Sequence, residues 1–173
     1  MTASVETALN QVDLAAVGGL IQHLQAEPEK VHTVWAANVK WTGGFRSEST
    51  VRDFAPVPSD EPTQLGGSNT APNPVEQLLV ALGNCLAVGY AANASVAGIE
   101  IKDLNIALDG DINMSSFLGL APGHAGFSAI RVKVDLVADA DPEAIAALHD
   151  RVAASSPVGH TLSAPVDVSI SPA

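Results

Sequence analysis

Cys85 carries the only thiol in the chain, and a thiol is well suited to nucleophilic and redox chemistry. It lies in the apolar run "PNPVEQLLVALGNCLAVGY" at 72–90, where its neighbours at helical spacing are small and apolar. Such surroundings disfavour the charged thiolate, so this run by itself indicates a small core residue rather than a reactive one. Reactivity requires a cation that the fold brings close, and Arg46 and Arg52 are the best candidates.

A second polar group lies in "SSPVGHTL" at 155–162, where Ser156 and His160 are four residues apart. A hydroxyl or thiol beside a histidine allows hydrolytic chemistry, with Ser156 or Cys85 as nucleophile and His160 as base. The chain has no G-x-S-x-G motif, however, and serines followed by Pro157 are typical of an ordinary helix end. Hydrolysis is therefore a distant alternative.

Metal and cofactor chemistry has no support in the spacing of the residues. The five histidines do not have the spacing of a metal site, and one cysteine cannot build a zinc site with several sulfur ligands. The glycine pairs at 43–44 and 66–67 do not match phosphate-binding or dinucleotide-binding fingerprints. We therefore expect no metal ion and no cofactor.

Length, composition and charge narrow the class of protein. A chain of 173 residues that is 47% hydrophobic and 16% charged is typical of one globular domain. The net charge of −11 repels phosphate backbones, so nucleic acid and anionic membranes are poor partners. One cysteine excludes an internal disulfide and leaves only intermolecular or mixed disulfides, which favours a reducing, intracellular setting. The first residues lack the basic stretch of a secretory signal, and we expect a cytoplasmic protein.

The elements that must position these side chains follow from the apolar periodicity. A helix is predicted over 3–27, because apolar residues recur at helical spacing and Pro28 ends the pattern. The helical stripe consists of Val5, Leu9, Val12 and Ala16. This N-terminal helix precedes the region that holds the reactive candidates.

A hairpin is predicted next. Alternation indicates a half-buried strand over 31–41, "TGGF" at 42–45 indicates a turn, and 46–54 is the return strand. One face of the return strand would hold Arg46, Glu48 and Arg52. The stretch 55–74 is rich in Pro, Gly and Ser and is predicted to be a long loop, either functional or a flexible connector.

The second half of the chain begins with a helix over 74–98, with Asn73 as its cap and Pro74 at its first position. The interruptions by glycine and asparagine indicate that this helix is buried in protein rather than in a bilayer. Strands are predicted over 104–110, 130–136 and 166–171, and a helix that Asp141 caps is predicted to bury Ile145, Leu148 and Val152. This order predicts an α+β protein with helices packed on an antiparallel-rich sheet.

Three stretches of the chain resemble one known family. "NPVEQLLVALGNCLA" (73–87) is similar to the central-helix signature N-P-x-E-x-L-L-x-A-L-G-x-C of the OsmC/Ohr family, the osmotically inducible and organic-hydroperoxide-resistance proteins. "GFSAIRVKVDL" (126–136) resembles the strand that follows, and "LHDRVAASSPVGHTLSAPVDVSI" (148–170) resembles the last helix, a Cys-Pro-Val turn and the closing strand. The resemblance implies an OsmC-like domain at 31–173 with a central buried helix, preceded by an added N-terminal helical extension at 1–30.

The resemblance also implies a chemistry. Typical members are intertwined homodimers that reduce organic hydroperoxides with two cysteines at the dimer interface, and an arginine from the early hairpin stabilises the thiolate. Cys85 matches the reactive cysteine, Arg46 matches the arginine, and Glu76 matches a widespread family glutamate, whereas Val75 replaces another helix-start glutamate. The second cysteine falls at Ser156, which implies a one-cysteine cycle that an external thiol completes.

Two functions remain open at this point. One is reduction of a hydroperoxide at Cys85, with Arg46 orienting the peroxide and the apolar helix residues favouring an organic substrate. The other is a non-catalytic dimer whose interface pocket binds a small apolar ligand, with Cys85 only lining it. The expected partners are a second copy of the chain, a small apolar hydroperoxide or other ligand, and an external thiol reductant.

Overall fold

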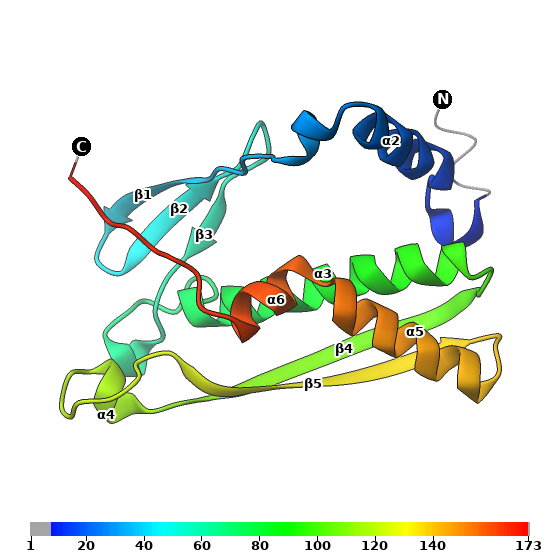
Figure 1. Cartoon of the computed structure of the whole chain (residues 1–173). Helices are drawn as coiled ribbons and strands as arrows, with labels where there is room; N and C mark the ends of the chain where they lie inside the picture. The colour runs from blue at the N-terminus through cyan, green and yellow to red at the C-terminus, as the bar shows by residue number, and fades with distance from the viewer. Residues whose placement is uncertain (1–7, 173) are drawn as a thin grey trace. The chain divides into compact units, whose positions relative to one another are not determined.

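Two separate antiparallel sheets and a set of helices make up the chain in a computed structural model that describes residues 8–172 (Figure 1). Residues up to 14 and from 81 onward form a first unit, and residues 15–80 form a second unit. The elements in chain order are η1 (Leu9–Gln11), α2 (Leu14–Ala26), η2 (Pro28–Val31), β1 (Asn38–Gly43), β2 (Arg46–Thr50), β3 (Val57–Ser59), η3 (Thr63–Leu65), α3 (Pro74–Val96), β4 (Ile101–Ile112), α4 (Met114–Phe117), β5 (Phe127–Ala138), α5 (Pro142–Ser155) and α6 (Pro157–Ser163). The predicted α+β class is confirmed.

The sheet of the first unit is the long antiparallel pair of β4 and β5. Leu104 pairs with Leu136 and Ile106 with Val134, and these apolar side chains are half-buried. The strands predicted over 104–110 and 130–136 are therefore confirmed, and both extend further. The alternate residues point away from the core, because successive side chains of a strand face opposite sides.

The core of the first unit lies where α3 and α5 pack together over that sheet (Figure 1). Its buried residues are Tyr90, Ala94, Ile99, Leu148 and Val152. Leu148 and Val152 belong to the stripe predicted for α5, and the Asp141 carboxylate accepts the Ala144 N–H, which confirms the predicted cap. Gly89 allows α5 to approach α3, since a Cβ there would lie 3.1 Å from Cγ1 of Val152.

The N-terminus of α3 is fixed by a reciprocal pair of hydrogen bonds. The Asn73 side chain accepts the Glu76 N–H at 2.9 Å, and the Glu76 carboxylate accepts the Asn73 N–H at 2.8 Å. Pro74 occupies the first helical position, as predicted, because its missing N–H has no partner there in any helix. This helix is also long and apolar enough to cross a membrane, with 22% of its most apolar stretch buried, but core helices of globular domains pass the same test.

The second unit contains a three-stranded antiparallel sheet in the order β1-β2-β3. The predicted turn is confirmed, and both of its glycines, Gly43 and Gly44, have positive φ. The strand predicted from residue 31 begins only at Asn38, and it is not half-buried, since Trp41 remains 71% exposed. The alternation of the sequence correctly identified the apolar face of β1. Within the described residues of this sheet, no side chain covers that face.

Arg52 does not lie on the face of β2 that carries Arg46. The strand ends at Thr50, and Arg52 has a φ of +51°, which is incompatible with an extended strand. Its guanidinium instead lies 4.6 Å from the ring centroid of Phe54, a cation–π distance. The prediction that Arg46, Glu48 and Arg52 share one face is therefore wrong for Arg52.

The predicted long loop 55–74 contains β3, η3 and a fully buried carboxylate, Asp60. Asp60 accepts N–H bonds from Glu61, Ser68 and Thr70 and a hydroxyl bond from Thr70. Burial alone would raise the pKa of Asp60, but these hydrogen bonds outweigh it and hold the pKa below its ordinary value. These bonds connect Ser68 and Thr70 to one buried carboxylate, which disfavours the flexible-connector alternative.

The N-terminal helix is shorter than predicted. The stripe does not lie on one helix, since Asn10 has a φ of +52° and Val12 is extended, so α2 begins only at Leu14; Val5 lies outside the described residues. Within the first unit, the Asn10 amide connects this segment to the end of α3 and the residues after it by bonds to Ser95, the Ile99 carbonyl and the Ile101 N–H. The division at residue 30 stays a prediction.

The C-terminal end also differs from the prediction. Residues 166–171 form no strand in the described part of the chain, although Val168 and Ile170 alternate with polar residues. The reason is that no strand pairs with this segment, and Ile170 is 96% exposed. Conversely, the short helix α6 was not predicted, because the pattern at Pro157 was interpreted only as a helix end.

Candidate functional site

The Cys85 thiol lies on α3 and is half-buried. Its Sγ is 3.2 Å from Oγ of Ser156, a residue 71 positions further along the chain. The contact joins the reactive candidate to the residue that the resemblance aligns with a second cysteine. The sulfur is therefore not enclosed in an apolar core. Its own helix had indicated such a core position, and the contact with Ser156 comes from elsewhere in the chain.

Ser156 is held at the junction of α5 and α6, where it ends one helix and caps the next. Pro157 restricts the preceding residue to extended backbone, and Ser156 has φ −77° and ψ 110°. Its Oγ accepts the Gly159 N–H at 3.0 Å, the usual bond of a serine cap. The residue is only 4% exposed, and this bond orients its hydroxyl oxygen.

A hollow of about 460 Å³ opens beside the sulfur. Its lining includes Asn84, Val88 and Asn93 from α3, together with Ser156 and Pro157. Among the described residues that line this hollow there is no charged side chain. A small molecule can therefore reach Cys85 without displacing an ion pair.

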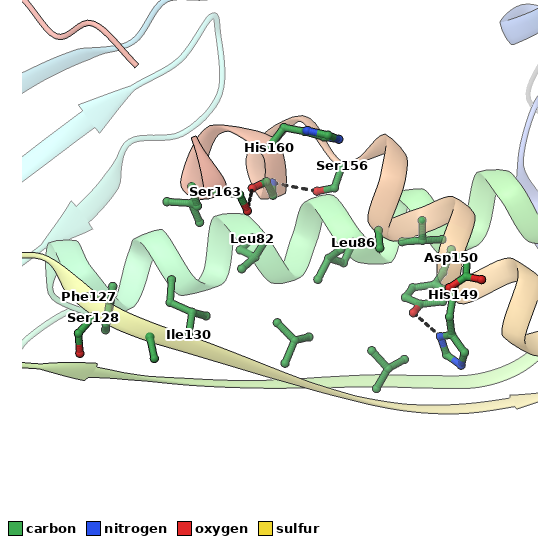
Figure 2. Close-up of a pocket in the computed structure, with 18 residues that line it drawn as sticks. Leu82, Leu86, Phe127, Ser128, Ile130, His149, Asp150, Ser156, His160 and Ser163 are labelled. Carbon is green, nitrogen blue, oxygen red and sulfur yellow. Dashed lines mark hydrogen bonds between the residues drawn. The ribbon is translucent and has the colours of Figure 1, made fainter. Parts of the chain in front are cut away.

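A larger cavity of about 710 Å³ lies between α3, β5, α5 and α6 (Figure 2). Its walls are mainly apolar, and Leu82, Leu86 and Ile130 project into it from α3 and β5 (Figure 2). Ser156 lines this cavity as well as the smaller hollow. A volume of this size is common for small-ligand sites.

One end of the larger cavity carries a polar pair that was not predicted. The Tyr90 hydroxyl and Nδ1 of His149 are 2.6 Å apart, and the two rings meet edge to face. Burial raises the pKa of the Tyr90 hydroxyl, which keeps it neutral. No periodicity could reveal this pair, because the residues belong to α3 and α5 and are 59 positions apart.

Arg46 and Glu76 both lie in the second unit. Arg46 is exposed, and its Nε donates to the Gly43 carbonyl at 3.3 Å within its own hairpin. Glu76 caps the start of α3, and Glu61 accepts a bond from the Asn73 amide beside it. The pairing of Arg46 with Cys85, and a role for Glu76 in a reaction, stay predictions.

The hydrolase alternative depended on a bond between His160 and a nucleophile. The His160 ring instead bonds the Ala154 carbonyl at 2.9 Å, and the Ser156 hydroxyl is engaged with Cys85 and Gly159. Within residues 8–172, no three His, Cys, Asp or Glu side chains are grouped to hold a metal ion. The geometry therefore offers a thiol beside a hydroxyl, rather than a serine beside a base.

Comparisons with known proteins identify one family for this chain. The model of the family described as "OsmC-like protein" matches residues 67–171. An OsmC-like protein from Mycoplasma pneumoniae is 17% identical, with a TM-score of 0.67 over 77% of this chain and 89% of that chain. An organic hydroperoxide resistance protein from Legionella pneumophila is 17% identical, with a TM-score of 0.59 over 77% and 91%. Another from Elizabethkingia anophelis is 18% identical, with a TM-score of 0.53 over 76% and 89%. None of the curated proteins matches the chain by sequence.

Proposed function

This chain belongs to the OsmC-like protein family, and on that premise we propose that it reduces organic hydroperoxides with Cys85 as its only catalytic thiol. The observation that carries the proposal is the half-buried Cys85 sulfur beside an uncharged hollow, with the Ser156 hydroxyl at 3.2 Å. Two solved structures of the same fold are described as organic hydroperoxide resistance proteins, which supports the substrate class.

The reaction follows from a single thiol. The Cys85 thiolate attacks one peroxide oxygen, the O–O bond breaks, and the alkoxide leaves as an alcohol after taking a proton, which leaves a sulfenic acid. An external thiol then displaces water to form a mixed disulfide with Cys85, and a second thiol releases the reduced enzyme and a small disulfide. Ser156 cannot replace that external thiol, because a hydroxyl forms no disulfide.

The proposal includes a homodimer in which Arg46 of either subunit approaches Cys85 and stabilises the thiolate and the leaving oxygen. Large apolar side chains that remain exposed in the single chain support an interface between copies. They include Trp35, Trp41, Val168 and Ile170. A reducing, cytoplasmic location agrees with the need for external thiols.

The direct test compares wild-type protein with Cys85→Ser. Each is mixed with cumene hydroperoxide or hydrogen peroxide and excess dithiothreitol, and the remaining peroxide is followed with time. Wild-type protein should consume the organic peroxide faster than hydrogen peroxide, and Cys85→Ser should match the buffer. Equal, slow consumption by both proteins would reject the proposal.

A gain-of-function variant tests the one-cysteine cycle. Ser156→Cys places a second sulfur where a hydroxyl now lies 3.2 Å from Sγ, which is close enough for a disulfide after a small side-chain rotation. One equivalent of cumene hydroperoxide should then give an internal disulfide, seen by mass spectrometry as the loss of two hydrogens. Wild-type protein should instead gain one oxygen. Wild-type protein cannot form an internal disulfide, because it has one cysteine. A sulfenic acid that persists in Ser156→Cys would contradict the observed proximity of residues 85 and 156.

The larger cavity favours a second candidate, the binding of a small apolar ligand without chemistry at Cys85. It combines mainly apolar walls with a few polar groups, among them the hydrogen-bonded pair of Tyr90 and His149, which is the usual composition of a ligand site. Saturable binding of an apolar probe that Ile130→Trp abolishes and Cys85→Ser leaves intact would support this alternative. Peroxide turnover that depends on Cys85 would favour the first.

A further inference from the structure

The Ser156 hydroxyl has two neighbours, and they determine where its proton lies. Its oxygen accepts the N–H of Gly159 at 3.0 Å, and that backbone group is always a donor. The remaining neighbour is Sγ of Cys85 at 3.2 Å. When Cys85 is a thiol, either atom can be the donor. When Cys85 is a thiolate, only the hydroxyl carries a proton, so Ser156 must donate.

The hydroxyl is also held in place before any reaction. Ser156 is 4% exposed, its backbone is restricted by Pro157, and its capping bond orients the side chain. Gly159 has no side chain to displace it, since a Cβ there would lie only 3.0 Å from the serine oxygen. A donor fixed in this way stabilises charge without a rearrangement during the reaction.

We propose that Ser156 is a positioning residue that donates a hydrogen bond to the Cys85 thiolate and so raises the reactive fraction of the thiol. This inference rests on the proposed function for its biological meaning, although the hydrogen bond itself needs no peroxide. The position that the resemblance aligns with a second cysteine would then serve a different task in this chain. It would activate the first thiol instead of resolving its oxidised form.

Among the residues that the structure describes, no charged side chain lines the hollow beside Cys85, so none there stabilises its thiolate in place of Ser156. Cys85 lies on α3 and faces the junction of α5 and α6, and the hollow beside it has no charged lining residue among those described. His149 and Asp150 of α5 and His160 of α6 line the larger cavity instead. Under the proposed function, Arg46 adds a cation that is the same in every variant compared below.

The test measures the rate of alkylation of Cys85 by iodoacetamide as a function of pH, together with the ultraviolet absorbance of the thiolate. Ser156→Ala and Ser156→Gly remove the donor, and Gly caps a helix nearly as well as Ser, so the second variant separates donation from capping. In both variants the pH profile of the alkylation rate should move to higher pH by about one unit and reach the same plateau. The rate near pH 7 should then be roughly tenfold lower, because it follows the thiolate fraction. Ser156→Thr keeps the hydroxyl and should restore most of the rate.

Thr161→Ala is the matched control. The Thr161 hydroxyl bonds the Pro157 carbonyl of its own helix at 2.9 Å, and Thr161 lines neither the hollow nor the larger cavity, so its removal should leave the profile unchanged. Rates and absorbance profiles of Ser156→Ala and Ser156→Gly that overlay the wild-type curves would overturn the inference. A displaced profile in a protein that reduces no hydroperoxide would instead reject the proposed function and retain the role of Ser156.

Discussion

The two sheets of this protein carry the same alternation of apolar and polar residues but differ in burial. In the first unit, Leu104 and Val134 on β4 and β5 are half-buried against the core around Leu148. In the second unit, Val39 and Trp41 on β1 are 63% and 71% exposed. Alternation therefore identifies the apolar face of a strand, but it does not identify what covers that face.

The difference has a physical source in the connections. The strands β4 and β5 pair over their whole length and are followed directly by α5, whose apolar stripe packs on the same core. The segment 166–171 has the same alternation and no strand partner, which leaves Val168 and Ile170 exposed. In the proposed homodimer, a second copy of the chain covers the apolar faces of β1 and of segment 166–171. The first sheet would then be buried within one chain, and these faces would be buried between two chains.

The largest expected effect is a loss of stability when the core of the first unit is altered. Leu148→Ala should reduce the free energy of unfolding by about 2–5 kcal/mol, because Leu148 is fully buried and its removal leaves a cavity. Urea unfolding followed by circular dichroism measures it. Leu148→Met is the matched control and should lose less than about 1.5 kcal/mol. A loss below about 1 kcal/mol for the alanine variant would mean that this core is loosely packed.

The next effect concerns the exposed region. Val168→Asp should weaken self-association by at least roughly tenfold, because it places an unpaired charge in the proposed interface. Sedimentation equilibrium of both proteins measures the dissociation constant. Ser169→Asp adds the same charge at the neighbouring polar position and should change the constant by less than about threefold. Equal effects of the two variants, or a monomeric wild type, would remove the interchain explanation.

The smallest effect is local and depends on pH. The pKa of Asp60 is lower in the folded loop than in an unfolded chain, so its stabilisation is fully present above about pH 3.9. It is lost as the pH falls further, through the folded-state value. The amides of Ser68 and Thr70 should therefore lose protection against hydrogen exchange in that range, because the loop opens as Asp60 is protonated.

Two variants check this assignment. Asp60→Asn should open the loop already at neutral pH, because the amide cannot accept all the bonds that the carboxylate accepts. Asp53→Asn changes an exposed carboxylate of the same unit and should leave the exchange unchanged. Protection of both amides that persists in Asp60→Asn would show that the backbone alone orders the loop.

Local signals predicted the elements that local physics determines. The Asn73-Pro74 start of α3, the Asp141 cap of α5 and the glycine turn at 43–44 each depend on residues within a few positions, and all three are confirmed. The misses occur where a distant residue competes with the local pattern. Asn10 leaves the predicted helix because its amide bonds the backbone at Ile99 and Ile101.

The sequence by itself determined that this protein has one thiol, that the thiol lies on a helix opened by Asn73, and that no internal disulfide can form. It also placed Ser156 at the position that the family resemblance aligns with a second cysteine. Only the tertiary structure brought Ser156 Oγ to 3.2 Å from the Cys85 sulfur, and only it joined Tyr90 to His149. These contacts depend on how α5 packs against α3, and such packing is set by side chains from the whole unit rather than by any local pattern.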